Sequence, residues 1–325
     1  MIGYKCEFKE LWVKHDPTGN GMSKIGQEQY SMTNSISTVA VIGCGTMGAG
    51  ICETASVAGL SVLCVEPNEE QQTAGRNRIL RSVTRGIERG KLKVANAEEV
   101  ISRITWNSHL DAASAAEFVI EAVHENEQLK CELFRHLGQV CPPEVILSSN
   151  TSSISITKLG AVSGRASQVV GLHFFNPVPI MRPVEIVRGL ETSPATLATT
   201  EALAKQLGMI PVVVRDSPGF AVNRVLMPLI NEAVFALEEG IASAESIDQL
   251  MKLGCNHPMG PLELADLIGL DVCLDILDVL HRQLGDPKFR AAPLLRRKVD
   301  AGHLGRKAGR GFYSYERVER PATQK

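Results

Sequence analysis

Residues 39–51 read Val39-Ala-Val-Ile-Gly-Cys-Gly-Thr-Met-Gly-Ala-Gly-Ile51, an apolar run that ends in closely spaced glycines. The apolar part predicts a buried strand, and the residues after Gly45 predict the start of a helix. Gly43 permits a tight turn between the two, Gly45 lets backbone N–H groups approach a ligand, and Gly48 lets the helix pack close to the strand. Because the N-terminus of a helix attracts negative charge, this turn predicts a phosphate site.

The segment after the turn indicates which phosphate ligand binds there. A second strand is predicted over residues 61–65, and it is followed directly by Glu66. A carboxylate at this place accepts hydrogen bonds from the ribose hydroxyls of NAD and repels the 2′-phosphate of NADP. An ordinary glycine-rich turn that packs a helix on a sheet is the alternative. The predicted NAD-binding residues of this region are Gly43, Gly45, Thr46, Met47, Gly48 and Glu66.

The composition is typical of a soluble globular protein. The chain has 325 residues, of which 44% are hydrophobic and 22% charged, and its formal net charge is -2. This balance is sufficient for two domains and argues against a general nucleic-acid surface. No apolar run approaches the length of a membrane span, so we expect no membrane partner. The eight cysteines are scattered without a Cys-x-x-Cys pair and the eight histidines form no metal-binding motif, which predicts reduced thiols, a cytoplasmic location and no bound metal.

Three regions are predicted along the chain. Residues 1–36 are polar and irregular, and we expect a disordered or accessory extension, with a short partner-binding helix around residues 8–13 as the alternative. Over residues 37–216, short apolar runs alternate with helical patterns, which is typical of a Rossmann-type, doubly wound α/β domain with a mostly parallel sheet. Residues 217–320 show helical periodicity only and predict an all-helical C-terminal domain. The first helix of this domain is apolar over much of its circumference, so we expect other helices or a second subunit to cover it.

His173 and Glu185 are candidates for acid–base chemistry. His173 ends a predicted strand and is followed by a loop that contains Pro177 and Pro179, which favour a chain reversal. The next predicted strand then brings Glu185 back beside His173. A carboxylate fixes the tautomer of a histidine and stabilises its protonated form, as a general base for an alcohol proton requires. A structural histidine at a strand end is the alternative.

The polar run Ser148-Ser-Asn-Thr-Ser-Ser153 ends another predicted strand. In an open parallel sheet, ligands bind at the carboxyl ends of the strands, so we expect these side chains at the same edge as His173. A hydroxyl group here is suited both to binding a substrate oxygen and to capping the next turn. The composition alone selects no single residue.

Five motifs, taken in order, resemble the L-3-hydroxyacyl-CoA dehydrogenase family, and within it the compact bacterial 3-hydroxybutyryl-CoA dehydrogenases. The resemblance covers about residues 37–316, which is nearly all of the chain after the extension. The motifs are Ser149-Asn-Thr-Ser-Ser153, Gly171-Leu-His-Phe-Phe-Asn-Pro-Val-Pro179, Pro218-Gly-Phe-Ala-Val-Asn-Arg224, His257-Pro-Met-Gly-Pro261 and Gly305-Arg-Lys-Ala-Gly-Arg-Gly-Phe-Tyr313.

This resemblance implies an NAD-dependent interconversion of an (S)-3-hydroxyacyl-CoA, with a short acyl chain, and the 3-oxoacyl-CoA. His173 is the implied base that takes the proton of the 3-hydroxyl group, and Glu185 is its partner. Ser152 and Asn223 match residues that hydrogen-bond the oxygen atoms of the substrate, and Ser152 also lies near the nicotinamide. Donors at that oxygen stabilise the charge that develops during hydride transfer. Further NAD contacts are implied at Glu121, Asn126, Asn176 and Lys307.

The helix predicted after Glu66 carries arginines on one face, because Arg78, Arg81, Arg85 and Arg89 recur at every third or fourth position. A solvated basic face is the ordinary interpretation of such a pattern. A site for the 3′-phosphate of coenzyme A is the alternative, and the family places coenzyme A at the positions of Ser82 and Arg89. We therefore expect an acyl-CoA substrate.

Two other functions are compatible with parts of this pattern. A hydroxyacid or sugar-acid dehydrogenase of the same fold, similar to L-gulonate 3-dehydrogenase, would share the NAD turn but not the arginine face. A non-catalytic relative similar to a lens crystallin would not need Ser152, His173, Glu185 and Asn223 together. The resemblance also implies a homodimer that forms through the C-terminal helical domain.

Overall fold

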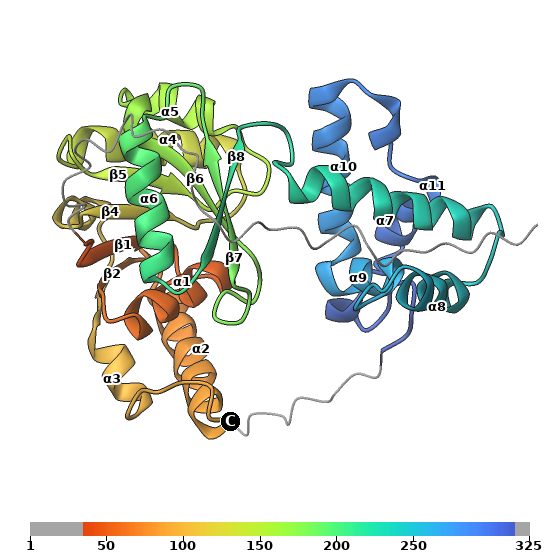
Figure 1. Cartoon of the computed structure of the whole chain (residues 1–325), viewed down its shortest axis with the longest axis horizontal. Coiled ribbons are helices and arrows are strands. Elements are labelled where there is room, and N and C mark those ends of the chain that lie inside the picture. Colours follow the sequence, from red (N-terminus) through yellow and green to blue (C-terminus); the bar gives the residue numbers. More distant parts are fainter. Residues whose placement is uncertain (1–34, 316–325) are drawn as a thin grey trace, which may run out of the picture. The chain divides into compact units, whose positions relative to one another are not determined.

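The protein was analysed as a computed structural model, which describes residues 35–315. Most of the N-terminal extension expected over residues 1–36, including the possible helix around residues 8–13, lies outside the described residues. Within them, strands and helices alternate up to residue 215, and helices alone follow from residue 222 (Figure 1). Residues 217–320 of the predicted helical domain are therefore described only as far as residue 315.

A single sheet of eight strands forms the centre of the first region. The strands are β1 (Thr38–Ile42), β2 (Ser61–Val65), β3 (Ile104–Asn107), β4 (Phe118–Glu121), β5 (Ile146–Ser149), β6 (Val169–Phe174), β7 (Pro183–Arg188) and β8 (Ile210–Arg215). Their order is β3-β2-β1-β4-β5-β6-β7-β8, and every neighbouring pair is parallel except β6 and β7. The predicted doubly wound, mostly parallel sheet is confirmed, and its order reverses at β1, where such sheets bind ligands.

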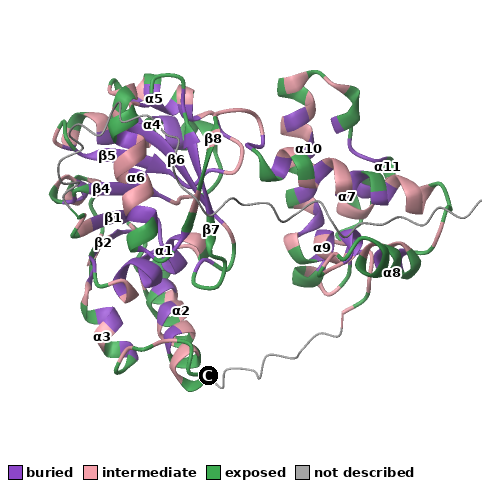
Figure 2. Cartoon of the chain, viewed as in Figure 1, coloured by how far each residue is buried: buried purple, intermediate pink, exposed green. Residues whose placement is uncertain are grey.

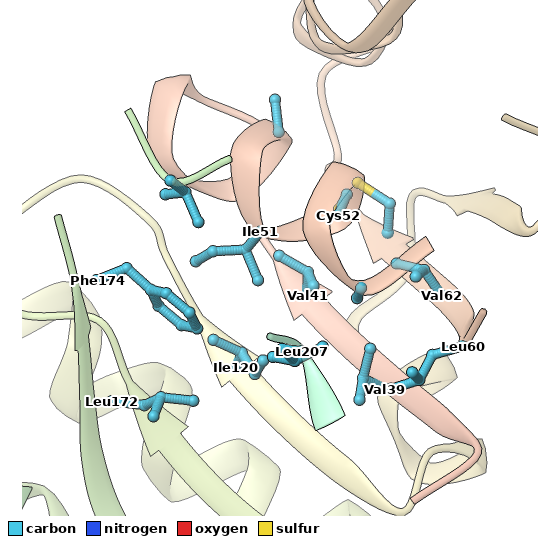
Figure 3. Packing of buried hydrophobic residues seen from close by; sticks show 14 of the residues in the cluster. Val39, Val41, Ile51, Cys52, Leu60, Val62, Ile120, Leu172, Phe174 and Leu207 are labelled. Carbon is cyan, nitrogen blue, oxygen red and sulfur yellow. The ribbon is translucent and has the colours of Figure 1, made fainter. Parts of the chain in front are cut away.

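Helices cover both faces of this sheet, as the alternation of side chains along each strand requires. In β1, Val39 and Val41 pack with α1 (Thr46–Val57), α2 (Glu69–Glu88), α3 (Ala97–Ser102) and α6 (Pro194–Gln206). Ala40 and Ile42 point to the other face, which α4 (Glu127–Val140) and α5 (Ile156–Ser163) cover. Figure 3 shows Val41 beside Ile51 of α1, and Val39 beside Leu60 in the same cluster, and Figure 2 shows the central strands buried.

The second region is built of helices around a core of its own. They are α7 (Val222–Glu238), α8 (Ala244–Gly254), α9 (Pro261–Ile268), α10 (Leu270–Leu284) and α11 (Pro293–Asp300). Their core includes Ile230 and Val234 of α7 and Leu277 of α10, none of which is exposed. An all-helical region after residue 216 was predicted correctly, although Val225 of α7 is 71% exposed, so the described residues do not cover all of its apolar surface.

Two buried aspartates attach the last described residues to this region. Asp266 of α9 accepts hydrogen bonds from the N–H groups of Phe312 and Tyr313, both at 2.9 Å. Asp248 of α8 accepts one from the Tyr313 hydroxyl at 2.8 Å. A Cβ atom at Gly311 would lie 1.9 Å from Asp266 Oδ1, so close packing explains this glycine of the last motif.

Candidate active site

The glycine-rich turn between β1 and α1 has the geometry that its sequence predicts. Gly43 has φ +94°, a conformation that favours glycine. A Cβ atom at Gly48 would lie 1.9 Å from the carbonyl oxygen of Gly43, whereas one at Gly45 would meet no atom within 4 Å. Gly48 is therefore required for packing, and the space at Gly45 is open for a ligand. No side chain of the described residues caps α1 at this end, so its first N–H groups are available to a phosphate.

A cavity of about 420 Å³ begins at this turn, lined by Gly43, Gly45, Glu66, Ala122 and His124 among others. Glu66 is half-buried in its wall, where its carboxylate accepts hydrogen bonds from the N–H groups of Cys44 and Asn68, both at 3.1 Å. The open glycine and the free helix terminus can offer N–H donors to the pyrophosphate of NAD, and the acid can accept hydrogen bonds from a ribose. The residues therefore fit this cofactor.

The remaining walls of this cavity were missed by the sequence analysis. They follow the carboxyl ends of β2, β3 and β4 or lie on the first turns of α2 and α4, and a rule based on strand ends could have found several of them. These residues are Pro67, Gln71, Ser108, Leu110, Val123, Leu129 and Leu133.

Glu121, one of the implied NAD contacts, lies at the end of β4. Its side chain is fully buried, 2.7 Å from Lys130 Nζ. It also accepts hydrogen bonds from Ser149 Oγ at 2.5 Å and from the N–H group of Val123 at 2.7 Å. Burial raises the pKa of Glu121, while Lys130 and these donors oppose that change. Protein groups thus enclose the carboxylate, and the NAD contact implied at Glu121 stays a prediction.

The hydroxyl groups at the end of β5 are distinguished by their partners. Ser148 Oγ donates to the carbonyl of Val119, and Ser149 Oγ donates to Glu121. Thr151 Oγ1 and Ser153 Oγ both donate to the carboxylate of Glu125. Ser152 is half-buried, and its hydroxyl forms no hydrogen bond within residues 35–315. Of the hydroxyl groups in this run, that of Ser152 is therefore the one without a partner in the described residues, and its substrate contact stays a prediction.

His173 and Glu185 form a buried pair on adjacent antiparallel strands. They lie opposite each other in the register of β6 and β7, and His173 Nδ1 is 2.8 Å from Glu185 Oε2. The rings of Phe175 and Phe220 lie 4.9 and 5.7 Å from the imidazole ring. The chain reversal predicted after His173 is thus confirmed. Because an ionised carboxylate only accepts hydrogen bonds, Nδ1 of the neutral imidazole carries the proton. Nε2 is then the nitrogen that can accept a proton from another group.

The second oxygen of Glu185 connects this pair to the start of α7. Glu185 Oε1 accepts hydrogen bonds from the N–H groups of Ala221 and Val222, both at 3.0 Å. Burial opposes ionisation of this carboxylate, but the bonds from His173 and from these N–H groups outweigh it and lower its pKa. The lowered pKa favours the ionised form of Glu185, which gives His173 a negatively charged neighbour.

Asn223, one residue further on, lies close to the hydroxyl run. Its Nδ2 donates to the carbonyl oxygen of Ser152 at 3.4 Å, a long hydrogen bond, and the residue is 8% exposed. The structure therefore brings together two of the predicted substrate contacts, Ser152 and Asn223, through the backbone of one and the side chain of the other.

The other predicted NAD contacts lie in three different places. Asn126 caps α4, where its side chain accepts a hydrogen bond from the N–H group of Leu129. Asn176 is exposed in the loop after β6 and precedes a cis bond to Pro177. Lys307 Nζ lies 2.6 Å from Asp271 Oδ2, within the helical region. Their NAD contacts stay predictions.

The arginine face of α2 is mostly exposed. Arg81, Arg85 and Arg89 are exposed, whereas Arg78 donates a hydrogen bond to the carbonyl of Cys44 in the glycine-rich turn. Ser82 lies beside them, and its hydroxyl donates to Glu53 Oε1 of α1 at 2.9 Å. This face can therefore present several cations to an anionic ligand.

Glu53 gives a prediction about pH and stability. It is 3% exposed, and burial raises its pKa to about 7, although the Ser82 hydrogen bond opposes this change. The unfolded chain then ionises at lower pH than the folded protein, so stability decreases as the pH rises from about 4.5 to 7, by about 3 kcal/mol in total. Glu53→Gln mimics the neutral form and does not lose this stability. Its free energy of unfolding, relative to that of the native protein, should therefore increase by about 2 kcal/mol from pH 5 to pH 8.

Urea unfolding of both proteins at pH 5 and pH 8 measures this difference. Glu70→Gln, which changes an exposed glutamate in the first turn of α2, is the control. A stability difference between Glu53→Gln and the native protein that does not change with pH would contradict the prediction.

Residues 35–315 contain neither a cluster of metal ligands nor a helix suited to span a membrane. No group of three or more His, Cys, Asp or Glu side chains in this part of the chain could hold a metal ion. Nor does any helix there have the length and apolar character needed to cross a membrane.

Comparison with known proteins agrees with this geometry. The model of the 3-hydroxyacyl-CoA dehydrogenase NAD-binding domain matches residues 38–217, and the model of the C-terminal domain of the same enzymes matches residues 219–315. The probable 3-hydroxybutyryl-CoA dehydrogenase of Bacillus subtilis is 50% identical over 281 residues, which cover 86% of this chain and 98% of that protein. The 3-hydroxybutyryl-CoA dehydrogenase of Bradyrhizobium diazoefficiens is 44% identical over 284 residues, 87% of this chain and 97% of that one.

A solved structure extends the similarity to three dimensions. The crystal structure of (S)-3-hydroxybutyryl-CoA dehydrogenase from Ralstonia eutropha matches with a TM-score of 0.84 and 49% sequence identity, over 87% of this chain and 100% of that one. Sequence, fold and the NAD-binding turn therefore agree, and the chain belongs to the family of NAD-dependent 3-hydroxyacyl-CoA dehydrogenases.

Proposed function

We propose that the protein interconverts a short-chain (S)-3-hydroxyacyl-CoA, such as 3-hydroxybutyryl-CoA, and the corresponding 3-oxoacyl-CoA. The observation that carries this proposal is the buried His173–Glu185 pair, whose free nitrogen Nε2 is suited to accept a proton. The names of the relatives from Bacillus, Bradyrhizobium and Ralstonia support the substrate class.

In the oxidation, His173 Nε2 removes the proton of the 3-hydroxyl group while NAD, when bound, accepts the hydride from C3. Glu185 holds the imidazole in the tautomer with a free Nε2 and then stabilises the positive charge that His173 acquires. In the reduction, the same nitrogen returns the proton to the oxygen of the 3-oxo group. The role of Glu185 is that of a fixed, ionised neighbour, since its pKa is lowered.

Ser152 and Asn223 are proposed to bind the oxygen atom on which charge develops. The Ser152 hydroxyl is the member of the 148–153 run that has no hydrogen bond within the described chain, so it is free to donate to a substrate. Asn223 Nδ2 has only a long bond of 3.4 Å, which a substrate oxygen can replace. Donors held in this way stabilise the transition state without reorganising.

Coenzyme A is proposed to bind along α2, with Ser82 and Arg89 as its anchors. A cavity of about 290 Å³ supports this path, because it is lined by Glu53, Lys91 and Leu92 on one side and by Val178 and Arg182 on another. Glu53 is the partner of Ser82, and Val178 follows shortly after His173 in the chain. The cavity thus extends from Glu53, the partner of Ser82, to the loop after the proposed base.

Activity is tested most directly by following NADH absorbance at 340 nm with acetoacetyl-CoA. We expect oxidation of NADH that depends on acetoacetyl-CoA, competition by free coenzyme A, and a decrease in kcat of about 10- to 100-fold in Ser152→Ala from the lost hydrogen bond. Absence of turnover at micromolar enzyme would favour a non-catalytic relative. Indifference to free coenzyme A would instead favour a hydroxyacid or sugar-acid substrate.

The helical region, over residues 217–320, is proposed as the site of homodimer formation, and residues 37–216 as the NAD-binding domain. Exposed apolar side chains support the dimer, since Leu250 and Leu253 of α8 are 66% and 77% exposed. The cysteines described between residues 35 and 315 are all free thiols, which supports a cytoplasmic location.

Light scattering at micromolar concentration should give twice the mass of one 35.2 kDa chain. Leu250→Glu combined with Leu253→Glu should shift the protein toward one chain. Leu190→Glu, at a residue that is 79% exposed in the sheet region, should not. The mass of a single chain for the native protein would contradict the dimer.

A further inference from the structure

We propose that Glu125 is a positioning residue that holds the Ser152 turn in place for the reaction. The proposal rests on the function proposed above, because Ser152 acts there as a donor to the substrate oxygen. Glu125 lies between β4 and α4 and was not among the residues that the sequence predicted for the site.

One carboxylate oxygen of Glu125 gathers three donors from the Ser152 turn. Glu125 Oε1 accepts hydrogen bonds from Thr151 Oγ1 at 2.5 Å, from the N–H group of Ser152 at 3.0 Å and from Ser153 Oγ at 3.1 Å. Hydrogen bonds to an ionised acceptor are shorter and stronger than neutral ones. The residues on both sides of Ser152, and its own backbone, are therefore bound to a single negative charge.

The other oxygen of Glu125 is bound by a buried cation. Lys130 is 1% exposed, and its Nζ lies 3.3 Å from Glu125 Oε2 and 2.7 Å from Glu121 Oε1. Glu121 in turn accepts a hydrogen bond from Ser149 Oγ. Lys130 thus joins two carboxylates, which together hold the chain from Ser149 to Ser153.

This arrangement explains how one hydroxyl of the turn remains available. Thr151 and Ser153 use their hydroxyls to bind Glu125, whereas Ser152 contributes only its N–H group. On its other side, the Ser152 carbonyl accepts the bond from Asn223. With its backbone held at both ends, Ser152 can direct its hydroxyl toward a substrate with little loss of conformational freedom on binding.

Glu125→Gln tests this role, because it retains the size of the side chain and removes its charge. We expect kcat with acetoacetyl-CoA and NADH to decrease about 10- to 100-fold, with NADH affinity within about twofold of the native value. Glu127→Gln is the matched control, since that carboxylate lies at the start of α4 and pairs with the exposed Lys158 instead. It should retain native kcat. Native kcat in Glu125→Gln would overturn the proposal.

A double-mutant cycle separates positioning from a general effect on the fold. If Glu125 acts through Ser152, the variant Ser152→Ala and the double variant Ser152→Ala with Glu125→Gln should have the same kcat/KM within about twofold. Effects that multiply in the double variant would overturn the proposal, because they would mean that Glu125 acts independently of Ser152.

Amide hydrogen exchange gives a readout that does not depend on turnover. Exchange of the amides of residues 151–154 should be faster in Glu125→Gln than in Glu127→Gln, since only the first removes the negative charge from the acceptor of the Ser152 N–H group and so weakens that hydrogen bond. Equal exchange in the two variants would overturn the positioning role, whatever the enzyme activity. Absence of turnover in the native protein together with faster exchange would refute only the proposed function.

Discussion

His173→Gln is expected to lower kcat by about 10²- to 10⁴-fold, the usual contribution of a general base. Glutamine is of similar polarity and can still bind Glu185, so the variant should fold, but its amide cannot accept the hydroxyl proton. Binding of NADH should change little, because the cavity at the glycine-rich turn does not include His173. The measurements are steady-state turnover of acetoacetyl-CoA and NADH fluorescence on binding.

The control for this prediction is His136→Gln. His136 of α4 is another histidine paired with a carboxylate, since its Nε2 lies 2.6 Å from Asp111 Oδ1, but both side chains of that pair are exposed. The control should turn over at the native rate. Turnover within tenfold of native in His173→Gln would reject His173 as the base, whereas loss of NADH binding in the same variant would indicate a structural role.

Gly48→Ala is expected to abolish NAD binding and to lower the melting temperature. The added Cβ would lie 1.9 Å from the carbonyl oxygen of Gly43, a distance that only a shift of the backbone can relieve. Such a shift would move α1 away from β1 and so displace the N–H groups that we expect to bind the pyrophosphate. Isothermal titration with NADH and thermal unfolding measure the two effects.

Gly45→Ala separates ligand approach from packing. A Cβ atom at Gly45 meets no protein atom within 4 Å, and the residue has φ -65°, which alanine adopts freely. The melting temperature should therefore stay native while NADH affinity decreases, because the methyl group enters the space that the cofactor needs. Equal loss of stability in the two variants would contradict the different roles that we assign to these glycines.

The part of the fold that follows from local patterns could be predicted from the sequence. The alternation of apolar runs and helices indicated the doubly wound sheet, and the loss of that alternation after Asp216 indicated the helical region. Strand β3 was not predicted, because Ile104 is the only one of its four residues that is buried, so no apolar run marks it. The antiparallel pairing of β6 and β7 followed from the two prolines after His173.

Some residues of the candidate site could also be predicted from the sequence, and others could not. Residues whose role depends on their own backbone or on a short loop, such as Gly43, Gly48, His173 and Glu185, could be predicted. Glu125 could not, because its importance arises from side chains about 27 residues later in the chain, and an acid before a helix is ordinarily a solvated residue. The contacts of Glu121 with Lys130 and Ser149 likewise depend on side chains from other parts of the chain, so they could not be predicted from its own position.

The hydrogen bonds of the two Glu185 oxygens indicate which exchanges of parts between related enzymes this carboxylate tolerates. His173 uses one oxygen, while the other is bound by the N–H groups of Ala221 and Val222, which belong to the segment that matches the C-terminal family domain. A chimaera that joined residues 38–217 of this chain to the C-terminal part of a relative would import two of the donors that lower the pKa of Glu185. Because those donors are backbone groups, almost any graft would supply them, and proline at either position is the one residue that would not.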